Sequence, residues 1–240
     1  TITSVNDTPT VSTVTDTTAE DTAVDVTLSG ADVDGDDLTF SIVSDVSNGT
    51  TSLTDSTVTY TPSTNFFGAD TLTYYATDGT ANSDTTSVFL TITSVNDTPT
   101  VSTVTDTTAE DTAVDVTLSG ADVDGDDLTF SIVSDVSNGT TSLTDSTVTY
   151  TPSTNFFGAD TLTYYATDGT ANSDTTSVFL TITSVNDAPT TEDVSTTIDE
   201  NRMARMAGIT LDGSDVDGDD LTYSLVTDPS NGTASIDGAT

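Results

Sequence analysis

The chain has 240 residues, with no cysteine and no histidine, and its 40 acidic residues against two basic ones give a formal net charge of −38. Such a polyanion repels nucleic acid and anionic membrane, because binding phosphate requires lysine and arginine. No stretch approaches the roughly 18 apolar residues of a membrane span. We therefore expect metal cations or basic proteins as partners, no nucleic acid and no direct membrane insertion.

The sequence repeats itself with a period of 90 residues. Residues 1–90 recur without change as residues 91–180, and a third copy begins at Thr181 and then diverges. This period suits a small independent domain and is too long for one turn of a solenoid. The Asn, Asp and Pro residues of segment 94–99 predict a linker. The expected parts are the last strand of a preceding repeat at 1–7, repeats at 8–97 and 98–187, and a partial, divergent repeat at 188–240.

Short segments of each repeat alternate apolar and polar residues, with the period typical of β-strands. Glycine, proline and Asn-Gly turn signals separate these segments, and none has a sustained helical period. In chain order, the first repeat has them at residues 11–14, 24–28, 38–42, 51–53, 58–60, 72–76 and 88–92. The pattern predicts an all-β fold of tandem seven-stranded antiparallel β-sandwiches in a linear array.

The densest acidic segment lies between the second and third predicted strands and reads Asp32-Val33-Asp34-Gly35-Asp36-Asp37. Its carboxylates repel one another unless they share a cation, and calcium takes six to eight oxygen ligands. The first three aspartates fit an EF-hand loop, but Asp37 and Val43 stand where that loop needs glycine and glutamate, and no helices flank it. A solvated acidic turn without a specific ligand is the other alternative.

Two more polar segments are expected at the same end of the sandwich. The turn Asp78-Gly79 follows the sixth predicted strand, and the linker residues Asn6 and Asp7 lead into the repeat at that end. Separate loops then bring oxygens to one pole, which favours a shared cation over a solvated turn.

These segments also carry a family resemblance. Segment 28–42 resembles the cadherin segment in which aspartates precede a Tyr/Phe-Ser-Ile strand, segment 75–79 resembles the cadherin Ala-x-Asp-x-Gly turn, and segment 95–99 resembles the cadherin Asn-Asp linker. Three further motifs join them: Glu20-Asp21-Thr22, Tyr60-Thr61-Pro62 and Asn65-Phe66-Phe67-Gly68. Together they are most similar to the bacterial cadherin-like tandem repeats of large surface adhesins, including those of the RTX type.

The resemblance implies calcium ions at each junction between repeats, ligated by carboxylates and by backbone or amide oxygens of asparagine. Ser94 replaces the first aspartate of the cadherin linker, and 63–65 lacks the Asp-Arg-Glu motif of animal cadherins, so we expect one or two ions at a junction. Carried over by position, the first junction would use Asn6, Asp7, Asp32, Asp34 and Asp78; the second Asn96, Asp97, Asp122, Asp124 and Asp168, with Glu20; the third Asn186, Asp187, Asp215 and Asp217, with Glu110.

We expect no enzyme, because the chain lacks histidine and cysteine and no nucleophile–base pair is visible. The resemblance implies an extracellular, cell-surface stalk of a bacterial adhesin, which calcium makes rigid and which supports adhesion or biofilm formation. The alternatives are a filament or matrix subunit that binds other copies of itself through its repeats, and a module that binds a surface glycan or protein through exposed aromatics such as Tyr75.

The third copy departs most from the others at residues 201–208. This segment adds three residues and contains Arg202 and Arg205, the two basic residues of the chain. It is interpreted as a divergent loop, with a partner contact or a tether to the acidic surface as the alternatives.

Overall fold

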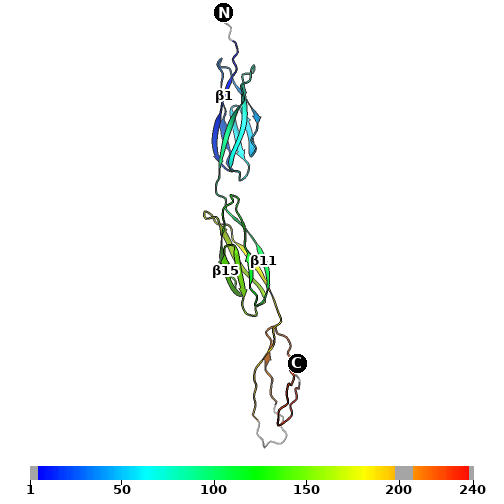
Figure 1. Cartoon of the computed structure of the whole chain (residues 1–240). Helices are drawn as coiled ribbons and strands as arrows, with labels where there is room; N and C mark the ends of the chain where they lie inside the picture. The colour runs from blue at the N-terminus through cyan, green and yellow to red at the C-terminus, as the bar shows by residue number, and fades with distance from the viewer. Residues whose placement is uncertain (1–4, 198–207, 238–240) are drawn as a thin grey trace. The chain divides into compact units, whose positions relative to one another are not determined.

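The computed structural model, drawn in Figure 1, describes residues 5–197 and 208–237. These residues belong to two compact units. The first unit comprises Thr1–Thr100, Ala121–Leu128 and Thr167–Ser173, and the second comprises Val101–Gly120, Thr129–Ala166 and Asp174–Thr240. Two predicted segments lie partly outside the described residues: residues 1–4 of the expected last strand of a preceding repeat at 1–7, and residues 201–207 of the divergent loop at 201–208.

The first repeat is built entirely of strands. They are β1 (Thr10–Ser12), β2 (Val14–Ala19), β3 (Val24–Thr27), β4 (Ser29–Ala31), β5 (Thr39–Ser44), β6 (Gly49–Thr54), β7 (Thr57–Pro62), β8 (Gly68–Thr77) and β9 (Thr86–Thr93). One sheet has the order β2-β9-β8-β5, a second has the order β3-β7-β6, and β1 pairs with β4. The pairing of β2 with β9 is parallel, whereas the other pairings of the repeat are antiparallel.

The second repeat has the same strands 90 positions later, as its identical sequence requires. They are β10 (Thr100–Ser102), β11 (Val104–Ala109), β12 (Val114–Thr117), β13 (Ser119–Ala121), β14 (Thr129–Ser134), β15 (Gly139–Thr144), β16 (Thr147–Pro152), β17 (Gly158–Thr167) and β18 (Thr176–Thr183). The divergent repeat has β19 (Thr190–Thr191) paired with β20 (Gly213–Ser214). The described residues contain no helix, and hence none able to cross a membrane, so the predicted all-β fold is confirmed.

The core of each sandwich is formed by the inward positions of the alternating segments. In the first repeat Val26, Val58, Leu72, Tyr74 and Val88 are almost completely buried. Burying such side chains contributes roughly 1.5–3 kcal/mol each before the entropy cost of ordering the chain. The polar outward positions of the same strands face water, which is the usual division of an antiparallel sheet.

Two of the predicted strands are divided in the structure. Segment 11–14 becomes β1 and β2, and segment 24–28 becomes β3 and β4. The second break falls at buried Leu28, where the chain changes its pairing from β7 to β1. The Tyr74 hydroxyl closes the end of the sandwich, lying 2.6 Å from the Ser12 carbonyl and 2.9 Å from that of Ser29.

Asp70 of β8 is a carboxylate buried in the sandwich, 5% exposed. One of its oxygens accepts hydrogen bonds from the Ser47 and Thr71 N–H groups, and the other accepts one of 2.7 Å from the Asn48 N–H. Burial, and then the negative charge of Asp70, raises the pKa of the neighbouring Tyr60 to about 12. Asp70 thus satisfies the backbone of the turn after β5, and its role is structural.

Candidate metal centres

The acidic loop after β4 folds around one of its own carboxylates. Asp32 Oδ1 accepts hydrogen bonds from the N–H groups of Asp34 at 2.8 Å and Gly35 at 3.1 Å. Gly35 has φ of +84°, a conformation that glycine adopts without strain and that turns the loop back on itself. The carboxylates of Asp32, Asp34 and Asp36 each place an oxygen within 4.8 Å of the others.

The segment leading into the first repeat contacts this loop. The Asp7 N–H donates to Asp34 Oδ2 at 2.7 Å, and the Asn6 amide donates to Asp78 Oδ2 at 2.8 Å. Hydrogen bonds from the Ala81 backbone N–H, the Asn6 side chain and the Thr80 N–H lower the pKa of Asp78 below its usual value. The structure therefore brings the residues predicted for the first junction to one end of the repeat.

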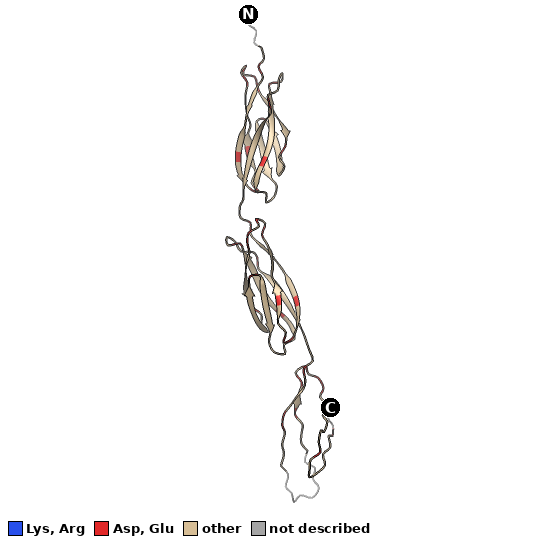
Figure 2. Cartoon of the chain, viewed as in Figure 1, with Lys and Arg blue, Asp and Glu red and all other residues tan. Residues whose placement is uncertain are grey.

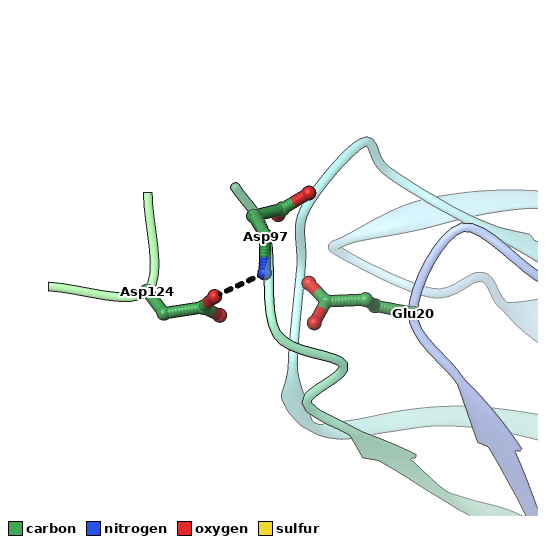
Figure 3. A group of neighbouring side chains, drawn as sticks. All are labelled: Glu20, Asp97 and Asp124. Carbon is green, nitrogen blue, oxygen red and sulfur yellow. Dashed lines mark hydrogen bonds between the residues drawn. The ribbon is translucent and has the colours of Figure 1, made fainter. Parts of the chain in front are cut away.

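The second predicted set meets in the same way within the first unit. Figure 3 shows Glu20, which directly follows β2, and Asp124, from the loop after β13, on opposite sides of the linker that carries Asp97. Their carboxylates lie within 4.8 Å of one another. The Asp97 N–H donates to Asp124 Oδ2 at 2.7 Å, and the Asn96 amide donates to Asp168 Oδ2 at 2.9 Å.

Several oxygens at this centre are buried and have no hydrogen-bond donor. They are Glu20 Oε2, Asp97 Oδ2 and Asp122 Oδ2, and Glu20 is only 4% exposed. A buried carboxylate oxygen without a donor costs several kcal/mol. The chain has two basic residues and no histidine, so few of its own side chains could place a positive charge beside these oxygens. A cation bound by these oxygens would satisfy them, so the residues fit a metal ion.

Asp124 belongs to two acidic groups. It lies within 4.8 Å of Glu20 and Asp97 in one group, and of Asp122 and Asp126 in the other. A carboxylate has two oxygens, so Asp124 could bridge two ions. Burial, and then the charges of Asp122 and Asp124, raises the pKa of Asp126. Asp126, like Asp36 in the first loop, was absent from the predicted ligands, although its alternate spacing with the other two aspartates was a signal for it.

The third predicted set is centred on Glu110, Asp187 and Asp217, whose carboxylates also lie within 4.8 Å of one another. The Asp187 N–H donates to Asp217 Oδ2 at 2.7 Å, and the Val185 N–H donates to Glu110 Oε1. Glu110 Oε2 and Asp187 Oδ2 are buried without a hydrogen-bond donor. Two other predicted ligands flank this group: the Asn186 amide donates to the Asp187 carbonyl, and Asp215 accepts from the Asp217 N–H.

The family is decided by comparison with known domains. The model of a family described as the bacterial Ig domain matches residues 6–91, 96–181 and 186–240, which make up most of the chain. The chain belongs to the bacterial Ig domain family. Bacterial Ig and cadherin-like domains are typically extracellular and typically without enzymatic activity. A search of curated proteins finds no match.

The bacterial Ig repeats share their fold with cadherin domains. A human CDH23 structure containing EC21-23 superposes with a TM-score of 0.66 at 17% identity, covering 89% of this chain and 82% of that one. Human mucin-like protocadherin EC1-2 gives 0.53 at 15% identity, covering 74% of this chain and 98% of that one. The predicted cadherin-like tandem repeat is thereby confirmed at the level of the fold.

A likeness to an enzyme is too weak to carry an argument. The chain spans 29% of the length of an endo-fucoidan hydrolase from glycoside hydrolase family 107, at 20% identity and a TM-score of 0.33, with 74% of this chain covered.

If these centres bind a cation, its binding is expected to weaken as the pH falls toward the pKa of their carboxylates. An ion binds deprotonated carboxylates, and the pKa of Asp126 is raised by burial and by neighbouring carboxylates. The pKa of Asp187 is likewise raised, by burial and then by Asp217 and Glu110. These groups take up protons at a higher pH than an ordinary aspartate does. Calorimetric calcium titrations at several pH values measure the loss.

The stability of the calcium-free protein has the opposite pH dependence for these two groups. Because their folded pKa is raised, the folded state binds protons more tightly than the unfolded chain, so their contribution to stability rises as the pH falls through the folded pKa. A calcium affinity that stays constant down to about pH 4, near the ordinary pKa of an aspartate, would contradict carboxylate ligation at these positions.

Proposed function

We propose that the chain is a calcium-rigidified spacer in the extracellular stalk of a bacterial surface adhesin, with a role in cell adhesion or biofilm formation. The observation that carries this proposal is the meeting of Glu20, Asp97 and Asp124, whose carboxylates converge while two of their buried oxygens lack any donor. Charged groups so placed repel one another unless a cation lies among them.

Calcium is the cation that suits these donors best. The groups offer oxygen only, which excludes the nitrogen and sulfur ligands that zinc and copper prefer. They offer several carboxylates from separate loops, and calcium accepts irregular sets of six to eight oxygens. Magnesium requires a smaller, near-octahedral shell and retains its waters. Extracellular modules of this kind bind calcium at roughly 10⁻⁴–10⁻³ M, a concentration found outside cells.

Rigidity follows from where the ligands lie in the sequence. Glu20 belongs to the repeat 8–97, Asp97 to the linker and Asp124 to the following repeat, so one ion would be shared by three segments. With the ion bound, the linker is held at both sides. Without it, the same carboxylates repel and the linker gains freedom. Identical tandem copies multiply length without changing the surface, which suits a spacer.

The cell-surface location and the connection with adhesins of the RTX type rest on the resemblance of the repeats to those of bacterial adhesins. A family whose domains are typically extracellular supports this part of the proposal. The proposed role requires no catalysis.

Small-angle scattering combined with thermal melting tests the proposal. In calcium, successive repeats are expected to keep a fixed relation and to melt at a higher temperature, and in chelator both effects are lost. Magnesium at the same concentration and ionic strength is the control. Scattering profiles and melting temperatures that are identical in calcium and in chelator would rule out the proposed mechanism while leaving the fold intact.

A further inference from the structure

One outer face of each sandwich has no charged side chain, although the chain carries a net charge of −38. It is the outward face of the sheet β2-β9-β8-β5, and we call it the hydroxyl face. Its positions follow from the strand register: Thr15, Thr17, Ser41, Ala69, Thr71, Thr73, Tyr75, Ser87, Phe89 and Thr91.

The acidic residues of these strands lie in the inward rows. Asp16 and Asp70 are the two acidic residues of the four strands, and both are in register with Leu90, whose side chain is buried. Figure 2 shows the strand ribbons of both repeats almost entirely in the colour of uncharged residues. The alternation of the strands therefore separates a face without charge from a chain that is otherwise densely acidic.

A large apolar side chain stands in the middle of the hydroxyl face. Phe89 lies in register between Thr15 on one side and Thr71 on the other, and it is 50% exposed. Val43, the extra residue at the bulge of the edge strand β5, is 56% exposed. The face thus combines an apolar centre with a ring of hydroxyl groups, a composition suited to burial against a partner.

We propose that the hydroxyl face binds the same face of a second copy of this chain. A second copy is itself a polyanion, so contact through an acidic surface would bring like charges together. Contact between two hydroxyl faces brings no like charges together. Threonine, serine and tyrosine hydroxyls both donate and accept hydrogen bonds, so the face is self-complementary, as a two-fold symmetric interface requires.

A glycan is a less suitable occupant of this face. Binding sites for small ligands are concave, whereas these positions lie on the outward side of an extended sheet. The outer face of the other sheet provides a contrast, because Asp25 of β3 lies on it and accepts a 2.6 Å hydrogen bond from Thr59. The charge-free face is therefore the better site for a second copy.

The size of the face predicts a weak interaction. Four strands about 4.8 Å apart, with rows spread over about 20–25 Å, present roughly 300–400 Å² from each copy. The total of under about 1,000 Å² lies below that of a stable interface, so the contact is transient. The second repeat offers the same face, with Thr161 and Phe179 at the central positions, so each chain has two such faces. Several weak contacts between chains would then act together.

Sedimentation velocity of matched charge variants tests this proposal. The variant Thr71→Glu/Thr161→Glu places one carboxylate on each hydroxyl face. The control Thr50→Glu/Thr140→Glu adds the same charge at exposed positions of β6 and β15, in the other sheet of each repeat. Wild type and control are expected to self-associate with a dissociation constant of roughly 10⁻⁴–10⁻³ M, and the face variant at least about 10-fold more weakly. Melting temperatures confirm that both variants fold.

Varying the salt and calcium concentrations distinguishes this self-association from the binding of calcium ions. Association should strengthen from about 0.05 M to about 0.5 M salt, because screening reduces repulsion between the polyanions. At the higher salt concentration it should persist in chelator, so a failure of the calcium proposal leaves it standing. A wild type that stays monomeric at about 1 mM, or a control weakened as much as the face variant, would overturn the proposal. So would a monomeric wild type that sediments with insoluble cellulose unless Phe89 and Phe179 are both replaced, which would assign the face to a glycan.

Discussion

The variant Asp124→Asn is expected to melt about 10 °C lower than the wild type in about 10 mM calcium. Asp124 belongs to both acidic groups of its centre, so one substitution removes a carboxylate from two candidate ion positions. An ion present at about 100 times its dissociation constant adds about 2.7 kcal/mol to folding stability. For a domain of this size, 1 kcal/mol shifts the melting temperature by about 4–8 °C. Differential scanning calorimetry measures the shift.

The loss of stability caused by this substitution should disappear or reverse when calcium is removed. In chelator, Asp124 is one more anion beside Asp97 and Glu20, so an amide in its place leaves the melting temperature unchanged or raises it. The control is Asp145→Asn, an exposed position in the turn between β15 and β16 that lies outside the acidic groups. A loss of equal size in calcium and in chelator would show that Asp124 serves the folding of its loop rather than ion binding.

Replacing Asp70 with alanine is expected to destabilise the first repeat by about 3–5 kcal/mol. The substitution removes the acceptor of the Ser47, Asn48 and Thr71 N–H groups. Each buried donor left without a partner costs about 1–3 kcal/mol. Because the second repeat keeps its own copy of this carboxylate, urea unfolding of the variant should divide into two steps, with the first repeat unfolding at the lower concentration.

Several variants distinguish this loss from a general effect of charge. Asp160→Ala should produce the same loss in the second repeat, where the same backbone groups donate to Asp160. Asp70→Asn keeps one acceptor oxygen and should lose less. These losses of stability should not depend on calcium, because Asp70 and Asp160 lie outside the acidic groups. Unfolding of the alanine variants at the wild-type midpoint would contradict the structural role of this carboxylate.

The strands could be predicted because their side chains alternate strictly. Val26 and Leu28 are two positions apart, as are Leu72 and Tyr74, and each of these side chains is buried in the structure. The division of two strands could not be predicted in this way. The run around Leu28 keeps its alternation, but the chain before it pairs with β7, whereas the chain after it pairs with β1. A hydrogen bond between distant segments leaves no local signal.

Asp70 was missed for a similar reason. In the sequence it follows Gly68 and Ala69, where an aspartate resembles the solvent-exposed turn residues found elsewhere in this chain. Its burial depends on a turn more than 20 residues earlier, whose backbone N–H groups require an acceptor. Composition and periodicity do not report where backbone donors end up in space.

The candidate metal centre was more predictable than this carboxylate. The run from Asp32 to Asp37 is dense enough in charge to require an explanation, and the linker and the Asp78 turn were expected at the same end of the sandwich. The resemblance supplied Glu20, which the structure places beside Asp97 and Asp124. The sharing of Asp124 by two groups depends on the folded loop, and a list of ligands by position does not contain it.

Anomalous scattering from crystals grown in calcium tests the central claim most directly. We predict a calcium peak among Glu20, Asp97 and Asp124, at about 2.3–2.6 Å from their carboxylate oxygens, with a second peak beside Asp122 and Asp126. Electron density for water alone among Glu20, Asp97 and Asp124, at saturating calcium, would contradict the account.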